Sequence, residues 1–294
     1  MDTFSIGSLR LDRIDELCGP AVDPWMLLPS LPADAVERNI DWFAPVFYDT
    51  AAAALILSLH GWVVRTQRYT VLVEACGGNH KNRPSYPRVD QLDTPWLKRL
   101  RAAGVAPEEI DFVFCSHLHV DHIGWFTELR DGQWVPTFAN AQYLMARREF
   151  DNWNPDTRTL PPFILQGDCF DDSIAPIVAS GQAVLVDDGH EIDTDLCIEA
   201  SYGHTLGHCS LRAASGGETG IFCGDIMHSP IEMAYPEVNT YACEDQNAAR
   251  TTRRAVLEEA AEYGHRLLPA HFPPPYSVCQ VGRRGDAFQV LAID

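Results

Sequence analysis

Four short polar motifs constrain the fold of this chain more than any other feature, because each one follows an apolar, strand-like run. They are HLHVDH at 117–122, GHTLGH at 203–208, FCGD at 222–225 and PAHF at 269–272. Together they contain His117, His119, Asp121, His122, His204, Asp225 and His271. Imidazole and carboxylate groups are the ligands of borderline divalent metals such as zinc. The order of these residues predicts two metal ions side by side at an edge shared by several strands.

The spacing within the first motif divides its residues between two sites. His117 and His119 lie two residues apart at the end of a strand, so both side chains can point to the same side and bind one ion. Asp121 and His122 lie in the turn that follows, where the reversing backbone can aim both at a second ion. Three histidines and an aspartate in six residues would be costly to bury without metal or charge partners. A metal site is therefore favoured over a purely structural role.

The other motifs complete these two sites. His204 follows the strand that ends at Ala200 and should complete the first site, and His271 should complete the second. Asp225 ends another strand, and a carboxylate can offer oxygen to two cations, so Asp225 is the expected bridge. His208, in the same tight turn as His204, is expected to hydrogen-bond and to fix that loop. The remaining histidines are interpreted as surface or satisfied polar groups: His60, His80, His190 and His265.

The composition favours small-molecule partners and a reducing compartment. At 294 residues and 46% hydrophobic content the chain can bury one large core or two small ones. The 22 Lys and Arg residues against 41 Asp and Glu residues give a net charge of −19, which disfavours nucleic acid and anionic membrane surfaces as partners. No signal-peptide pattern is evident, and the longest apolar stretch, Ala51–Leu59, is too short to span a bilayer. Nine cysteines without a CxxC pair are expected to be reduced and mostly buried, as in a cytoplasmic protein.

The hydrophobic pattern predicts strands mixed with helices, with sheets flanked by helices. Strands are predicted near 55–59, 62–66, 69–74, 112–115, 142–145, 183–187, 196–200, 210–213, 221–223 and 266–268. Helices are predicted over 94–103, with Thr94 as N-cap, and over 247–263, with Gly264 as the stop. Residues 1–50 are interpreted as an irregular N-terminal extension, and 151–174 as a loop or lid. Because no linker divides the sequence, residues 1–294 are expected to form a single domain.

These motifs resemble those of the metallo-β-lactamase superfamily, and the resemblance extends from about Trp62 to Phe272. It implies an α/β (α+β) fold, an αββα sandwich with a dinuclear metal site at the sheet edges. It also implies which residues hold the two divalent ions: His117, His119 and His204 the first, Asp121, His122 and His271 the second, with Asp225 and a hydroxide bridging both. Zinc is the expected metal, with manganese, iron or cobalt as alternatives for such His/Asp sites.

Details of the motifs narrow the resemblance to hydrolases of small acyl compounds. True β-lactamases of the superfamily lack the bridging aspartate, and iron flavodiiron enzymes have glutamate at the position of His119. Superfamily nucleases are disfavoured by the net charge of −19. Quorum-quenching lactonases, pyridoxolactonase, glyoxalase II thioesterases and methyl-parathion-hydrolase-like phosphotriesterases remain. The N-terminal extension and the sequence GDIMH at 224–228 are more similar to the lactonases and parathion hydrolases than to glyoxalase II.

Two positions depart from the family pattern. Glu74 stands where many members have an aspartate, and His228 stands where acyl-homoserine lactonases have a tyrosine that donates to the substrate. His228 is therefore either a hydrogen-bond donor to the substrate or leaving oxygen, or a structural or surface histidine. Asp121 and Asp225 are the other expected catalytic residues, and Asp121 could also shuttle a proton besides binding metal.

Three functions remain open, in order of preference. The first is a lactone or small-ester hydrolase in which a hydroxide bridging the two ions attacks the carbonyl carbon. The second is a phosphotriesterase or aryl-ester hydrolase, with a glyoxalase II-type thioesterase less favoured. The third is a metal-dependent interaction or sensing module, which would need a missing ligand or a plugged pocket. The expected partner is a small-molecule lactone or ester, a homodimer is left open, and aromatic side chains could wall the pocket: Trp25, Phe43, Trp153, Phe163 and Tyr276.

Overall fold

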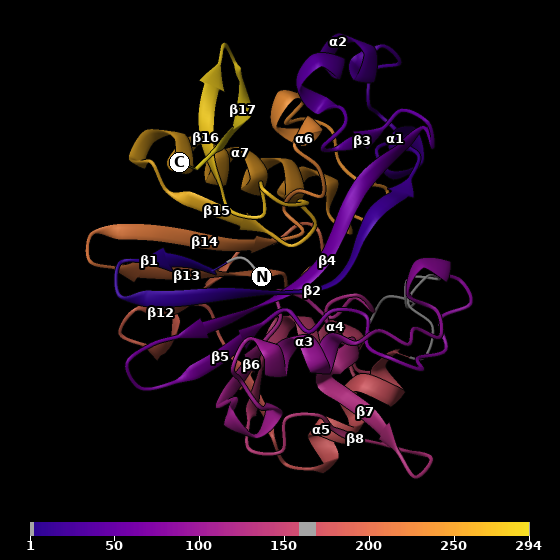
Figure 1. Ribbon diagram of the computed structural model, residues 1–294, viewed down its shortest axis with the longest axis vertical. Helices are drawn as coiled ribbons and strands as arrows, with labels where there is room; N and C mark the ends of the chain where they lie inside the picture. Colours follow the sequence, from indigo (N-terminus) through magenta and orange to yellow (C-terminus); the bar gives the residue numbers. More distant parts are fainter. Residues whose placement is uncertain (1–2, 159–168, 294) are drawn as a thin grey trace.

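The computed structural model describes residues 3–158 and 169–293, which form two sheets with helices on both outer faces (Figure 1). The first sheet, in spatial order, consists of β1 Thr3–Ile6, β2 Leu9–Val22, β4 Ala54–Arg65, β5 Thr70–Val73, β6 Phe112–Phe114, β9 Gln142–Ala146 and β10 Ala183–Val186, with β3 Tyr48–Asp49 paired to β4. The second consists of β11 His190–Asp193, β12 Leu196–Ala200, β13 Cys209–Ser215, β14 Glu218–Gly224, β15 Arg266–Pro269, β16 Cys279–Arg284 and β17 Ala287–Ala292. A hairpin of β7 Thr127–Arg130 and β8 Gln133–Pro136 stands apart from both sheets. The predicted αββα sandwich is confirmed.

The helices are mostly short. They are α1 Pro24–Leu27, α2 Ala35–Phe43, α3 Trp96–Ala102, α4 Arg147–Trp153, α5 Ala175–Ala179, α6 Ile231–Ala234 and α7 Gln246–Tyr263, together with single turns at Pro87–Val89, Pro107–Glu109, Gly124–Phe126 and Phe170–Ile174. The two helices predicted from periodicity are confirmed as α3 and α7. Asp245 caps α7 by accepting from the N–H groups of Asn247 and Ala248, and Gly264 ends it at φ 69°. Thr94 does not cap α3, because its hydroxyl donates to Glu16 instead.

Alternating side chains along the strands build the core between and outside the sheets. One cluster lies between them and includes Leu11, Val64 and Phe114 from the first sheet with Leu211 and Phe222 from the second. The opposite face of β4, β5 and β6 packs against α3, and the outer face of β14 and β15 packs against α7. Because successive strand residues point to opposite faces, these almost wholly apolar strands are covered on both sides.

The prediction of an irregular N-terminal extension is wrong. β2 pairs antiparallel with β4 from Arg10 opposite Arg65 to Val22 opposite Leu55, so this segment belongs to the first sheet. Polar residues hide the strand in the sequence, because Asp12 and Glu16 are buried and hydrogen-bonded rather than exposed. Asp12 accepts from Thr3 and pairs with Arg65, while Glu16 accepts from Gly77 N–H and Trp125 Nε1.

The predicted loop or lid over 151–174 is also wrong at both ends. Residues 151–153 belong to α4, and Phe170–Ile174 forms a π-helical turn. One of the acidic residues that favoured a loop points inward, since Asp172 accepts from both Nη1 and Nη2 of the buried Arg83 at 2.6 Å. The middle of the predicted lid, 159–168, including Phe163, lies outside the described residues.

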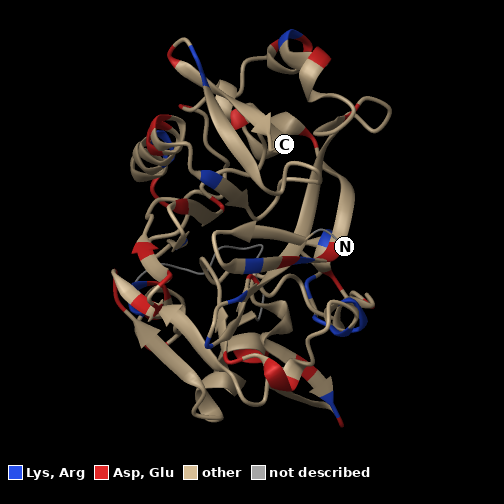
Figure 2. Cartoon of the chain, turned by 60° about the vertical axis from the view of Figure 1, so that its left-hand side comes forward, with Lys and Arg blue, Asp and Glu red and all other residues tan. Residues whose placement is uncertain are grey.

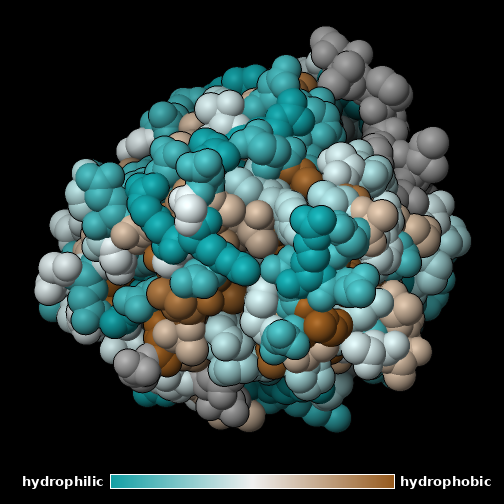
Figure 3. All heavy atoms as spheres, turned by 90° about the horizontal axis from the view of Figure 1, so that it is seen from above, coloured by the Kyte–Doolittle hydropathy of each residue, from teal (hydrophilic) through white to brown (hydrophobic). Residues whose placement is uncertain are grey.

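Charged side chains are distributed over the helices and loops around the sandwich, while long parts of the strands carry none (Figure 2). On the face that carries α2 and β17, apolar surface is divided into several small areas among polar ones (Figure 3). The cysteines are free thiols and most are buried, as predicted. Across residues 3–158 and 169–293, none of the helices combines the length and apolar character needed to cross a membrane.

Candidate metal centre

The four sequence motifs meet where the two sheets share an edge. HLHVDH follows β6 of the first sheet, GHTLGH follows β12 of the second, and FCGD and PAHF overlap the ends of β14 and β15. β14 and β15 are parallel neighbours, so their carboxyl ends bring Asp225 and His271 to the same edge. Gly224 lets Asp225 lie beside the first motif, because a Cβ at Gly224 would be 2.5 Å from the Ser116 Cβ and its φ is +48°. Strand ends of both sheets therefore supply one site.

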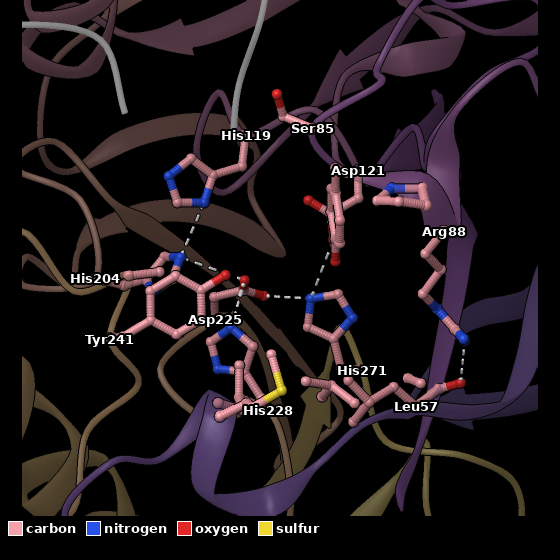
Figure 4. A pocket seen from close by; sticks show the side chains of 17 residues that line it. Leu57, Ser85, Arg88, His119, Asp121, His204, Asp225, His228, Tyr241 and His271 are labelled. Carbon is pink, nitrogen blue, oxygen red and sulfur yellow. Dashed lines mark hydrogen bonds and ion pairs between the residues drawn. The ribbon is translucent and has the colours of Figure 1, made fainter. Parts of the chain in front are cut away.

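The first predicted group of ligands is assembled at this edge. Ligand atoms of His117, His119, His204 and Asp225 all lie within 4.8 Å of one another. Nδ1 of His119 is 3.1 Å from Nε2 of His204, and the ring centroids of His117 and His119 are 4.3 Å apart. The side chains of His119, His204 and Asp225 point toward one another in Figure 4.

The second predicted group lies directly beside the first. Asp121, His122 and His271 also have ligand atoms within 4.8 Å of one another. Nε2 of His271 is 3.7 Å from Asp121 Oδ2, and Nε2 of His122 is 3.8 Å from Asp121 Oδ1. All seven side chains selected from the sequence are thus brought together and buried.

The two oxygens of Asp225 face different groups. Oδ2 lies 3.7 Å from His117 Nε2 and 3.4 Å from His204 Nε2. Oδ1 lies 3.4 Å from His122 Nε2 and 3.0 Å from His271 Nε2. This is the geometry expected of a carboxylate shared between two cations.

The unsatisfied atoms of the centre fit a pair of metal ions. His117 Nε2, His122 Nε2 and Asp225 Oδ1 are buried and, among the described residues, have no hydrogen-bond partner. Leaving such groups unpaired would cost about 1–3 kcal/mol each. Burial holds the pKa of His117 and of His204 well below the usual range and so favours the neutral imidazoles that bind metal, whereas Asp225 and the other nearby carboxylates outweigh burial and raise the pKa of His122 and of His271. Burial alone would raise the pKa of Asp225, but the neighbouring histidines, His271 first, hold it well below its usual range.

Hydrogen bonds behind the ligands fix which ring nitrogen faces the centre. Nδ1 of His271 lies 3.0 Å from the Ser58 carbonyl oxygen, so Nδ1 donates and Nε2 points inward. Nδ1 of His122 lies 2.8 Å from Glu74 Oε2. Glu74 Oε1 also accepts from the Ser116 N–H at 3.2 Å. Glu74 therefore supports the site although the family pattern has aspartate there.

The other histidines divide into three kinds. His208 lies 2.8 Å from Ser201 Oγ through Nδ1 and accepts from the Asp225 N–H through Nε2, so its predicted loop-fixing role agrees with the structure. His60 was expected to be a surface or satisfied group, but it is buried and its Nε2 has no partner among the described residues. The remaining three are at least partly exposed, as expected: His80, His190 and His265.

A model of the metallo-beta-lactamase superfamily matches residues 60–277. The chain belongs to the metallo-beta-lactamase superfamily. Among solved structures, hydrolase AbOPH of this superfamily is similar at TM-score 0.83 and 21% identity, covering 99% of this chain and 97% of that one. AidC, a dizinc quorum-quenching lactonase in complex with the product N-hexanoyl-L-homoserine, is similar at TM-score 0.80 and 19% identity over 100% and 97%. A probable metal-dependent hydrolase from Staphylococcus aureus follows at 0.74 and 17% over 99% of both chains. At these identities the likeness establishes the fold.

A pocket of about 420 Å³ opens over the metallo-beta-lactamase centre. Its floor includes His119, Asp121, His204, Asp225 and His271 (Figure 4). Apolar side chains, many of them from the N-terminal segment, form part of its walls: Ala21, Val22, Met26, Leu27, Leu57 and Pro87. The rest of the walls is more polar and comes from two loops: Ser85, Tyr86, Arg88 and Tyr241. These wall residues were not predicted from the sequence. The apolar residues around Leu27, in a segment predicted to be irregular, could have indicated that this segment is buried against the rest of the protein.

The four proposed aromatic residues that the structure describes do not line this pocket. Phe43 is buried with Phe47 and Tyr48, and Tyr276 packs on Phe47 at a ring-centroid distance of 4.9 Å. Trp25 packs at the edge of the same cluster. Trp153 lies behind the centre, where its ring meets that of His119 edge-on at 5.6 Å.

His228 lines the pocket and faces the shared carboxylate. Its Nε2 lies 3.0 Å from Asp225 Oδ2, and its ring stacks on that of His271 at 5.2 Å. Glu232 fixes the turn by accepting from the N–H groups of His228 and Ser229. With His228 buried, the alternative of a surface histidine is excluded. The side chain is in place either to donate to a bound substrate or to support the ligands.

Proposed function

We propose that this metallo-beta-lactamase-fold chain hydrolyses lactones or small carboxylic esters with two divalent metal ions, zinc first among them. The division of the Asp225 oxygens between two groups of ligands, at 3.0–3.7 Å from four imidazole nitrogens, is the observation that carries the proposal. The lactonase of the superfamily described above, with its product bound, supports a lactone as the substrate class.

The residues that would hold the ions follow from the two groups. His117, His119 and His204 would bind one ion, Asp121, His122 and His271 the other, and Asp225 both. When bound, such a pair of ions supplies an acidified water as nucleophile and polarises the carbonyl oxygen.

Side chains of the pocket would bind the substrate and transfer protons. Val22, Leu27 and Leu57 exclude water and hold the apolar part of an ester beside the floor. His228 holds a proton at Nε2 that can be donated to the leaving oxygen, because that nitrogen points to the Asp225 end of the pocket. Asp121 lies at the floor, where its carboxylate can accept a proton.

A comparison of substrates tests this proposal. We expect the zinc-loaded protein to open an alkyl-substituted γ-lactone and to leave a p-nitrophenyl phosphotriester unchanged or nearly so. The Asp225→Asn variant is the matched control, since it keeps the pocket wall and should turn over neither compound. Turnover of the phosphotriester without the lactone would instead establish the second candidate, a phosphotriesterase.

A further inference from the structure

A buried carboxylate lies behind the first group of ligands. Glu149 is 1% exposed and lies in α4, directly after β9. Its Oε1 accepts from the Leu118 N–H at 3.1 Å and from Trp153 Nε1 at 2.9 Å. Its Oε2 accepts from Thr205 Oγ1 at 2.8 Å and from the Gly207 N–H at 3.0 Å. One side chain therefore contacts two of the motif loops.

The four donors surround the three histidines of the first group. Leu118 stands between His117 and His119 in the sequence, and Thr205 directly follows His204. The Trp153 ring packs edge-on against the His119 ring. Each imidazole of the first group is therefore adjacent to a residue that Glu149 holds.

The hydrogen bonds of Glu149 constrain its position and that of the two loops it contacts. Among the described residues its hydrogen-bond partners are all neutral, so these four donors offset only part of the cost of burying a carboxylate. Both oxygens are satisfied only when the HLHVDH and GHTLGH loops keep one separation. Gly207 allows this close approach, because a Cβ there would lie 2.2 Å from the Glu149 nitrogen.

We propose that Glu149 is a positioning residue that fixes the distance between these two loops and thereby sets the metal affinity of the first group. The inference rests on the metal centre of the proposed function, but not on the substrate. Glu74 has the corresponding place behind the second group, where it contacts His122 Nδ1 at 2.8 Å. Each group of ligands thus has its own buried carboxylate.

Replacement of Glu149 by glutamine changes the hydrogen bonds that position the two loops without changing the volume of the side chain. Glu149→Gln keeps the size of the side chain but turns one acceptor into a donor, so either the Leu118 and Trp153 pair or the Thr205 and Gly207 pair loses its acceptor. Loss of such an outer partner typically weakens metal binding by about 10–100-fold. Glu74→Gln is the matched variant for the second group.

Two zinc dissociation constants per chain, measured by competition with a chromophoric chelator, test the inference. We expect Glu149→Gln to weaken one of them by about 10–100-fold, Glu74→Gln to weaken the other, and the double variant to weaken both. On a His119→Ala background, where the first group is incomplete, Glu149→Gln should leave the remaining site unaltered. Wild-type constants for Glu149→Gln, or equal weakening of both sites, would overturn the inference.

Two further measurements keep the outcomes distinct. If Glu149→Gln does not fold, Trp153→Phe removes one donor and keeps an aromatic side chain, and it should still weaken one zinc site severalfold. A purely structural Glu149 would lower the melting temperature of the metal-free protein and leave both constants unchanged, which counts against the inference. Wild-type protein that binds zinc but hydrolyses no ester would overturn the proposed substrate class and leave the role of Glu149 standing.

Discussion

Asp225 joins two sets of histidines, each of which contains residues from both sheets, and this makes it the most sensitive single residue of the centre. Asparagine at this position keeps one oxygen, loses the negative charge and replaces the other oxygen by an amide nitrogen. That nitrogen would face either His122 and His271 or His117 and His204, depending on which oxygen it replaces. We expect Asp225→Asn to bind fewer than two ions per chain and to lose hydrolysis, with its circular dichroism spectrum kept. Elemental analysis and turnover of the same sample check this. Two bound ions with wild-type turnover would contradict the bridging role.

His228 differs from the ligands because it faces both the shared carboxylate and the pocket. A donor that acts mainly in the transition state contributes to kcat, so His228→Ala should lower kcat by ~10²–10³-fold and leave both ions bound. Metal content, melting temperature and kcat are measured together on the best ester found. If the melting temperature falls while kcat stays near normal, His228 supports the ligands and donates nothing to the substrate.

Residue chemistry made it predictable that these seven side chains would meet, because four short motifs contain them and each motif lies at the end of an apolar strand. The residues that surround the ligands were not predictable in this way. Glu149 lies in the polar stretch ARREFDN, and only the fold shows that its side chain turns inward toward Leu118 and Gly207. His60 was misread for the same reason, since burial on a strand depends on which face a neighbouring sheet covers.

Among the elements, the loop between β5 and α3 is held by buried charges. Lys81 donates to Thr127 Oγ1 and to the Asp172 carbonyl, and Arg83 forms a two-pronged pair with the Asp172 carboxylate. The same loop places Tyr86 and Arg88 in the pocket wall. Charges far from the centre thus fix one wall of the site.

Lys81 gives this loop a measurable pH dependence. Burial lowers its pKa from 10.5 to about 7, although Asp172 acts in the opposite direction. Between these values the unfolded chain binds a proton that the folded chain has released, so the free energy of unfolding rises with pH in this window. We expect the metal-free wild type to gain about 1–2 kcal/mol from pH 7 to 8.5 relative to Lys81→Met, measured by urea unfolding. Lys98→Met, at an exposed position of α3, should keep the wild-type pH dependence.

β2 shows why the secondary structure of the N-terminal segment was not predicted from the sequence. The periodicity of α7 is visible because its buried residues are apolar, among them Leu257 and Ala260. β2 instead buries Asp12 and Glu16 together with Leu11, so its alternation of polarity is lost. Two of the partners that satisfy these carboxylates, Arg65 for Asp12 and Trp125 for Glu16, lie 53 and 109 positions away in the chain, and a local pattern cannot anticipate them.

For the whole molecule, the centre lies at the shared edge of the sheets while the apolar clusters lie between and outside them. The candidate metal ligands are therefore additions to a core that packs without them. Nε2 of His117 and Nε2 of His122, however, are buried and have no hydrogen-bond partner among the described residues. Metal should consequently contribute to stability without being required for the fold.

Removal of metal tests this division between core and centre. Ions that bind the folded chain and not the unfolded one add about 2.7 kcal/mol per site when the free metal is at 100 times its Kd. For two sites in a chain of 294 residues this corresponds to a fall in Tm of about 10 °C on chelation. We expect the far-ultraviolet circular dichroism at 20 °C to be unchanged in the chelated protein, and two equivalents of zinc to restore both Tm and hydrolysis. Full recovery with one equivalent would contradict the shared role of Asp225, and unfolding on chelation would show that the centre is part of the core after all.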